Sequence, residues 1–165
     1  MSIVVFSAPI QSGKTTALQQ WCQQKVFVDG VLMPDVNGAR QFYHIANHLF
    51  IPVEVTNPET FNGLMIGVGK YHFSASAFAS SNAILMNAWK QQPNWLIIDE
   101  IGKLELSGEG LFPSFSSILH SYHQFPSSTN LLIVVRDSLY ETVVSTFRIG
   151  EHQLISSATL LHQLK

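Results

Sequence analysis

The chain has 165 residues, of which 46% are hydrophobic and 12% are charged, and its formal net charge is −2. This length and composition predict a single domain over residues 1–165 with a sizeable core, and they exclude a disordered chain. We expect no nucleic-acid partner, because nucleic-acid binding depends on clustered lysine and arginine and the sequence has no basic block.

The sequence also limits where the protein works. Cys22 is its one cysteine, so no disulfide can form within the chain, which is typical of a reducing compartment. The first residues lack the basic segment of a signal peptide, and no apolar run approaches the roughly 18 residues of a membrane span. We therefore expect a cytoplasmic protein with no membrane partner.

The first predicted elements are a buried strand over residues 3–6, a loop, and a helix over about 14–24. The loop ends in Gly13-Lys14-Thr15, the ending of a phosphate-binding P-loop, in which backbone N–H groups and a helix N-terminus face the anion. Alanine occupies position 8, where the strict pattern has glycine, and we expect it to be tolerated if its φ is negative. The residues expected to bind the phosphates are Gln11, Ser12, Gly13, Lys14, Thr15 and Thr16.

The next segment carries mostly strand signals. We expect a strand over 26–28, a turn at Asp29-Gly30, a hairpin over 31–46 turning at Asn37-Gly38, and an edge strand over 51–55. A polar connector and an apolar segment over 64–73 follow, so this region predicts an antiparallel addition to a parallel core. Ser74 is the predicted N-cap of a helix over 75–91.

A second apolar run, over residues 94–100, ends in Asp99-Glu100. Ligands of open α/β sheets bind at the carboxyl ends of the strands. We therefore expect Asp99 to hold Mg²⁺ through water, and Glu100 to orient and deprotonate an attacking water. An Asp-Glu pair alone would fit a solvated turn equally well, and the P-loop favours the metal-binding interpretation.

The rest of the chain predicts three helices and two strands. Ser107 is the expected cap of a helix over 108–123 with Pro113 in its first turn, and a core strand over 130–135 follows. Asp137 is the expected N-cap of a helix near 138–146. A short strand over 152–155 and a helix over 159–165 end the chain.

The segment Asp99-Glu100-Ile101-Gly102-Lys103-Leu104-Glu105-Leu106, together with Ser12-Gly13-Lys14-Thr15-Thr16, resembles the thermophilic-type nucleoside-triphosphatase family, which includes the cancer-related nucleoside-triphosphatase. The resemblance implies an α/β, three-layer, RecA-like P-loop fold with a mostly parallel sheet and an antiparallel β-hairpin addition. It implies slow Mg²⁺-dependent hydrolysis of nucleoside triphosphates, ATP, GTP or others, to diphosphates with broad base tolerance. By position, it assigns phosphate and metal binding to Lys14 and Thr15, metal binding to Asp99, and water activation to Glu100.

Two further cations have alternative interpretations. The resemblance places Lys103 in the loop beyond the metal-binding strand, where its charge suggests a phosphate contact. A surface ion pair with Glu105 is an equally simple interpretation. Arg136 could stabilise the transferred phosphoryl group as an arginine finger in cis, or could form a structural salt bridge with Asp137 or Glu141.

Three functions are compatible with these motifs. Hydrolysis is favoured, because Glu100 beside Asp99 supplies a base for water. A nucleotide or small-molecule kinase would need an arginine-rich lid, and the three arginines, Arg40, Arg136 and Arg148, are not clustered in the sequence. A nucleotide-dependent switch would bind tightly and turn over only with a partner.

Overall fold

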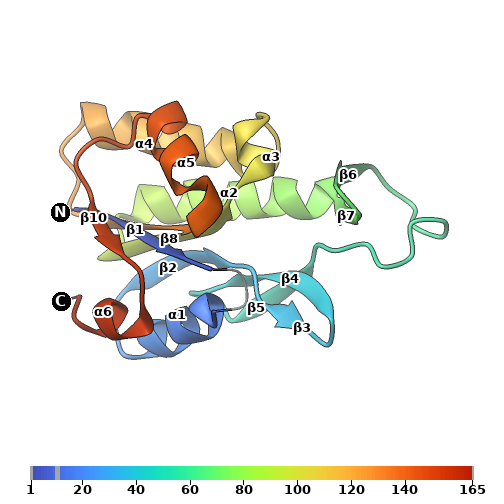
Figure 1. Cartoon of the computed structure of the whole chain (residues 1–165), viewed down its shortest axis with the longest axis horizontal. Helices are drawn as coiled ribbons and strands as arrows, with labels where there is room; N and C mark the ends of the chain where they lie inside the picture. The colour runs from blue at the N-terminus through green and yellow to red at the C-terminus, as the bar shows by residue number, and fades with distance from the viewer. Residues whose placement is uncertain (1, 10–11, 165) are drawn as a thin grey trace.

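A mostly parallel, eight-stranded sheet lies at the centre of the computed structural model, which describes residues 2–9 and 12–164 (Figure 1). Its strands follow the order β10-β1-β9-β8-β2-β4-β3, and β5 pairs with β4. The parallel strands are β1 (Ile3–Ala8), β2 (Val28–Leu32), β8 (Trp95–Ile101), β9 (Asn130–Arg136) and β10 (Gln153–Ile155). The antiparallel strands at one edge are β3 (Asp35–Val36), β4 (Ala39–His44) and β5 (Leu49–Pro52).

Helices cover both faces of this sheet. One face carries α1 (Lys14–Gln23) and α6 (Ala158–His162), and the other carries α2 (Ala75–Gln91), α4 (Phe112–Gln124) and α5 (Tyr140–Phe147), with the short α3 (Lys103–Leu106) at their end (Figure 1). A small antiparallel hairpin of β6 (Met65–Val68) and β7 (Tyr71–Ser74) precedes α2. The structure confirms the predicted three-layer α/β fold with an antiparallel addition.

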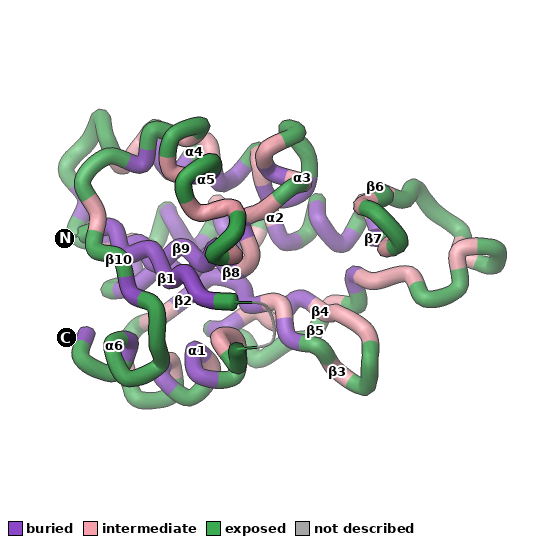
Figure 2. The backbone as a smooth tube through the Cα atoms, viewed as in Figure 1, coloured by how far each residue is buried: buried purple, intermediate pink, exposed green. Residues whose placement is uncertain are grey.

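Alternation along the strands fills two cores, one on each face of the sheet. In β1, Ile3 and Val5 belong to the core beneath α2, α4 and α5, whereas Val4 and Phe6 belong to the core beside α1 and α6. Because both faces are covered, the central strands are continuously apolar rather than alternating, as parallel strands usually are. Figure 2 shows these strands buried between exposed outer helices.

The strand order decides where a nucleotide can bind. The P-loop follows β1 and the acidic pair lies near the end of β8, and β9 lies between these two strands. Since β1, β8 and β9 run parallel, their carboxyl ends meet at one edge of the sheet, where ligands of such sheets bind. No described helix is both long and apolar enough to cross a membrane.

The predicted turn at Asp29-Gly30 is wrong, because both residues lie within β2. Gly30 pairs with Ile97 of β8, and a Cβ on Gly30 would lie 2.1 Å from the Ile97 carbonyl oxygen. Glycine is therefore required here for close approach of two strands, not for a turn. Asp29 is buried in the strand and accepts a hydrogen bond from its own neighbour, the Gly30 N–H, at 2.7 Å.

Several other boundaries differ from the prediction. Ser107 ends α3 instead of capping α4, which begins at Phe112 after Leu111, although Pro113 lies in its first turn as expected. A 3-10 turn over Asp137–Leu139 separates β9 from α5, so Asp137 does not cap that helix. The Ser74 cap is confirmed: its hydroxyl accepts a hydrogen bond from the Ala77 N–H at 3.3 Å.

Candidate phosphate-binding and catalytic site

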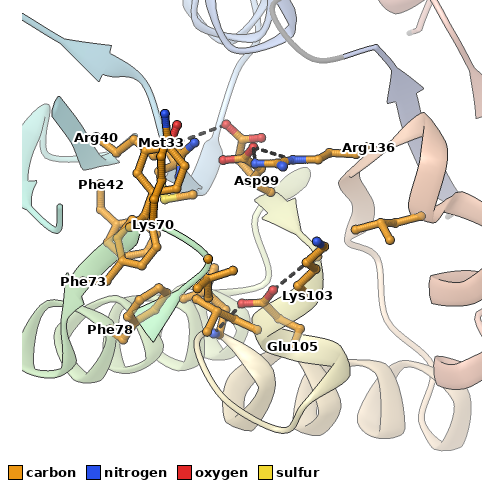
Figure 3. Close-up of a pocket in the computed structure, with 18 residues that line it drawn as sticks. Met33, Arg40, Phe42, Lys70, Phe73, Phe78, Asp99, Lys103, Glu105 and Arg136 are labelled. Carbon is orange, nitrogen blue, oxygen red and sulfur yellow. Dashed lines mark hydrogen bonds and ion pairs between the residues drawn. The ribbon is translucent and has the colours of Figure 1, made fainter. Parts of the chain in front are cut away.

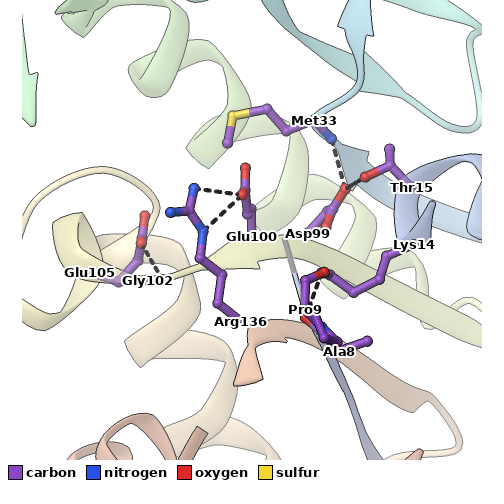
Figure 4. Close-up of polar contacts among 10 residues, drawn as sticks. All are labelled: Ala8, Pro9, Lys14, Thr15, Met33, Asp99, Glu100, Gly102, Glu105 and Arg136. Carbon is purple, nitrogen blue, oxygen red and sulfur yellow. Dashed lines mark hydrogen bonds and ion pairs between the residues drawn. The ribbon is translucent and has the colours of Figure 1, made fainter. Parts of the chain in front are cut away.

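Five of the predicted site residues, Lys14, Thr15, Asp99, Glu100 and Arg136, lie together at the carboxyl ends of β1, β8 and β9 (Figure 4). In the register of β1 and β9, Ala8 lies opposite Arg136. Lys14 begins α1 directly after the P-loop, and Asp99 and Glu100 lie near the end of β8. Segments more than 80 residues apart along the chain thus contribute to one site, with Thr15 hydrogen-bonded to Asp99.

Gly13 is the N-cap of α1 and adopts a left-handed backbone with φ of 78°. This conformation favours glycine, and it leaves the first N–H groups of α1 pointing toward the loop, where an anion would bind. The absence of the usual first glycine has a simple explanation, because Ala8 is the last residue of β1 and is not among the residues with positive φ. Alanine is thus tolerated at that position without strain.

Lys14 bends back over the P-loop. Its Nζ donates hydrogen bonds to the carbonyl oxygens of Ala8 and Pro9, both at 2.7 Å. Partial burial lowers the pKa of Lys14, while the nearby Asp99 and Glu100 charges oppose this decrease. The ammonium is therefore held over the loop by two neutral acceptors, which it can exchange for phosphate oxygens. Ser12 is exposed on this loop and Thr16 is exposed in the first turn of α1, and the predicted contact of Gln11 lies outside the described residues.

Asp99 is only 1% exposed, and one of its carboxylate oxygens accepts two hydrogen bonds. These come from the Thr15 hydroxyl at 3.2 Å and the Met33 N–H at 3.0 Å. Desolvation and the charge of Glu100 raise the pKa of Asp99 to about 6, while the two hydrogen bonds oppose this increase. A buried carboxylate next to a hydroxyl is a set of hard oxygen donors that fits Mg²⁺.

Glu100 lies in a bulge of β8. The pairing of β8 with β9 shifts between Ile98 and Ile101, and Glu100 has a left-handed φ of 67°. Bulges of this kind redirect a side chain and are common beside active sites, and a non-glycine residue in this conformation is strained. The strained backbone thus occurs at Glu100, the residue that the sequence predicts to be the general base.

Arg136 forms an ion pair with Glu100. Its Nη2 and Nε donate to one carboxylate oxygen of Glu100 at 2.9 and 3.2 Å, and about a quarter of each side chain is exposed. The alternative salt-bridge partners predicted from the sequence, Asp137 and Glu141, are therefore wrong: the partner lies on the neighbouring strand. The pair places a cation directly on Glu100, the residue that follows Asp99 in β8.

Lys103 and Glu105 do not pair with each other in the described part of the chain. The Glu105 carboxylate is 3% exposed and accepts hydrogen bonds from two backbone groups, the Gly102 N–H at 2.8 Å and the Leu111 N–H at 2.9 Å. Glu105 therefore braces the loop around α3, and burial raises its pKa. Lys103 is exposed at the first position of α3 and faces a cavity.

Sequence reasoning missed two parts of the site. One is the Met33 N–H, a backbone contact that carries no sequence signal. The other is a cavity of about 220 Å³ beside Glu100, which is lined by residues of β4, the β6–β7 hairpin and α3 (Figure 3). Arg40 and Arg136, which are far apart in the sequence, both border this cavity, from opposite sides.

Comparisons with known proteins agree with this architecture. A family model described as NTPase matches residues 3–159. The fold is similar to that of THEP1 from the hyperthermophile Aquifex aeolicus, with a TM-score of 0.71 and 18% identity over 93% of this chain and 88% of that one. It is also similar to a human cancer-related nucleoside triphosphatase, with a TM-score of 0.68 and 21% identity over 98% of this chain and 94% of that one. A comparison with curated protein sequences gave no match.

Proposed function

The chain belongs to the NTPase family, and we propose that it hydrolyses nucleoside triphosphates to diphosphates in a Mg²⁺-dependent reaction with broad base tolerance. The observation that carries the proposal is the meeting of a P-loop lysine, two carboxylates and an arginine at one sheet edge. Phosphoryl transfer requires mainly positioning and neutralisation of charge, and this set of residues supplies both. All residues of this set would contact the triphosphate rather than the nucleobase, which supports broad base tolerance.

The P-loop would bind the phosphates through its backbone N–H groups and Lys14. Binding would exchange the Ala8 and Pro9 carbonyl oxygens on Lys14 for phosphate oxygens, without a rearrangement of the fold. Thr15 and Asp99 would hold Mg²⁺, with a water between Asp99 and the ion. When bound, the metal supplies charge neutralisation at the phosphate oxygens and orients them for displacement.

Glu100 is the proposed general base, because its carboxylate lies at the end of β8 next to the metal-binding Asp99. In the ligand-free protein this carboxylate is held by Arg136. A phosphate group carries more negative charge than a carboxylate and is therefore a stronger partner for a guanidinium. Binding of a triphosphate would therefore draw Arg136 toward the γ-phosphate and release Glu100 to accept a proton from water. This gives Arg136 both of the roles considered from the sequence, in succession.

The test is release of phosphate from a panel of ribo- and deoxyribonucleoside triphosphates with Mg²⁺, for the wild type and Glu100→Gln. Loss of a general base typically lowers the rate by about 10²–10⁴-fold, and nucleotide binding should persist. Glu109→Gln is the matched control, since Glu109 is an exposed carboxylate on the loop after α3 and should keep the wild-type rate. An undiminished rate in Glu100→Gln would exclude the proposed base, and binding without release in the wild type would exclude a stand-alone hydrolase.

A further inference from the structure

The cavity beside Glu100 extends from the catalytic residues to side chains that the proposed hydrolysis does not use. Asp99, Glu100 and Arg136 border it at the catalytic edge, so a molecule inside it would lie next to the reacting phosphate (Figure 3). The rest of the wall is largely apolar, and it includes four aromatic side chains from β4, β7 and α2, namely Phe42, Tyr71, Phe73 and Phe78. Its volume, about 220 Å³, is below the roughly 300–1,000 Å³ of pockets for drug-sized ligands, so its ligand would be of nucleoside size or smaller.

Four cations from four parts of the chain also border the cavity. Figure 3 shows Arg40 and Lys70 on the hairpin side and Arg136 and Lys103 on the opposite side. Among the described residues, only Arg136 of these four forms an ion pair, and its partner is Glu100. Of the three carboxylates in the lining, Glu105 is already occupied by two backbone N–H groups. Four cations against three carboxylates leave a formal excess of one positive charge around the cavity, which favours an anion.

Arg40 and Lys70 are also arranged around an aromatic ring. The Arg40 guanidinium lies 4.4 Å from the centre of the Tyr71 ring and 5.7 Å from that of Phe73, and the Lys70 Nζ lies 5.3 Å from the Tyr71 ring. Such cation–π contacts hold the positive groups against the apolar wall without neutralising them. A planar ring can stack on this wall, and an anionic substituent on it can pair with the cations.

We propose that this cavity binds a small, planar, anionic molecule that carries a hydroxyl group, and that the enzyme transfers the γ-phosphoryl group to that hydroxyl. The proposal rests on the proposed function for binding of the triphosphate, and it replaces water by a second substrate. The acceptor oxygen forms a bond to the γ-phosphorus while the bond from that phosphorus to the β-phosphate oxygen breaks. The hydroxyl proton goes to Glu100, and the diphosphate leaves with the electron pair of the broken bond.

The position of Glu100 favours a hydroxyl acceptor over a phosphate acceptor. A phosphate oxygen is already deprotonated near neutral pH and needs no base, whereas a hydroxyl group must lose its proton during transfer. Glu100 borders the cavity, so one carboxylate can serve both water and a hydroxyl acceptor. Slow hydrolysis would then be the reaction that occurs when the cavity holds only water.

The experiment measures binding and transfer separately. Two probes, 4-hydroxybenzoate and pyridoxine 5′-phosphate, are titrated into the full chain with Mg²⁺ and a non-hydrolysable triphosphate. Each probe is then incubated with γ-labelled triphosphate, and labelled probe is separated from labelled phosphate. We expect at least one probe to bind while the triphosphate is bound, and label to appear on its hydroxyl group.

Two variants test whether the probe binds in the cavity. Arg40→Ala should weaken binding of the probe about tenfold and lower the ratio of transferred to released phosphate by a similar factor, because it removes one cation and part of the wall. Lys90→Ala removes an exposed cation at the end of α2, away from the cavity lining, and should leave both unchanged.

Three outcomes would overturn the proposal: no probe binds, the triphosphate displaces the probe, or label is found only on phosphate. Displacement would mean that the nucleotide's own base occupies the cavity. Phosphate release without any probe reports hydrolysis independently, so failure of the acceptor site and failure of the hydrolase can be told apart.

Discussion

Replacement of Asp99 by asparagine should make the ligand-free protein more stable at neutral pH while removing its metal ligand. The Asp99 carboxylate is 1% exposed, and desolvation together with the charge of Glu100 raises its pKa from 3.8 to about 6. Between these two values the folded state binds more protons than the unfolded state. The free energy of unfolding therefore falls as pH rises from about 4 to 6, and it stays lower above that range.

The magnitude follows from the same two values. Each tenfold difference in proton affinity corresponds to about 1.4 kcal/mol, so the increase in the pKa of Asp99 sets an upper limit of about 3 kcal/mol. Asparagine at position 99 keeps an acceptor oxygen for Thr15 and Met33 but cannot ionise. The effect of asparagine on hydrogen bonding is the same at every pH. Any pH dependence of the difference in unfolding free energy between the two proteins therefore reports the charge of Asp99 alone.

The assay is urea unfolding of the wild type and Asp99→Asn at pH 4 and pH 7.5, with EDTA and no nucleotide. We expect the unfolding free energy of the variant, relative to that of the wild type, to rise by up to about 3 kcal/mol between these pH values. Asp35→Asn changes an exposed aspartate and should show little of this effect. Parallel pH dependence of the wild type and Asp99→Asn would refute the reasoning, because it would mean that burial does not perturb Asp99.

Three further predictions concern the supports of the site. Glu105→Gln should lower the free energy of unfolding in urea by about 1–3 kcal/mol, because an amide has one acceptor oxygen for two buried N–H groups. The control, the exposed Glu109→Gln, should change it little. Equal stabilities of the two variants would contradict the role of Glu105 in holding the loop around α3. Gly30→Ala should abolish cooperative unfolding, since a Cβ would lie 2.1 Å from a backbone oxygen of β8, whereas Gly38→Ala, with open space at its Cβ, should cost about 1–2 kcal/mol. Lys14→Ala should weaken nucleotide binding about 10–100-fold in calorimetry, and an unchanged affinity would exclude its phosphate contact.

The sequence by itself predicted the fold class and the residues that meet at the carboxyl ends of the central strands. The P-loop ending in Gly13-Lys14-Thr15 and the apolar strand ending in Asp99-Glu100 are local patterns. Each follows from what a phosphate or a metal requires of adjacent residues. The helix over Ala75–Gln91 was predictable in the same way, because the residues that cap it, Ser74, and end it, before Pro93, are next to it in the sequence. Local rules are sufficient where the cause lies within a few residues along the chain.

Only the tertiary structure decided what depends on strands that are distant in sequence. Asp29-Gly30 has the local signature of a turn, but contact between β2 and β8 makes it part of a strand. The pairing of Arg136 with Glu100 requires neighbouring positions of β9 and β8, and no spacing along the chain encodes that adjacency. The gathering of Arg40 and Arg136 at one cavity is likewise a product of strand order. Such contacts are set by packing across the sheet, which sequence periodicity alone does not specify.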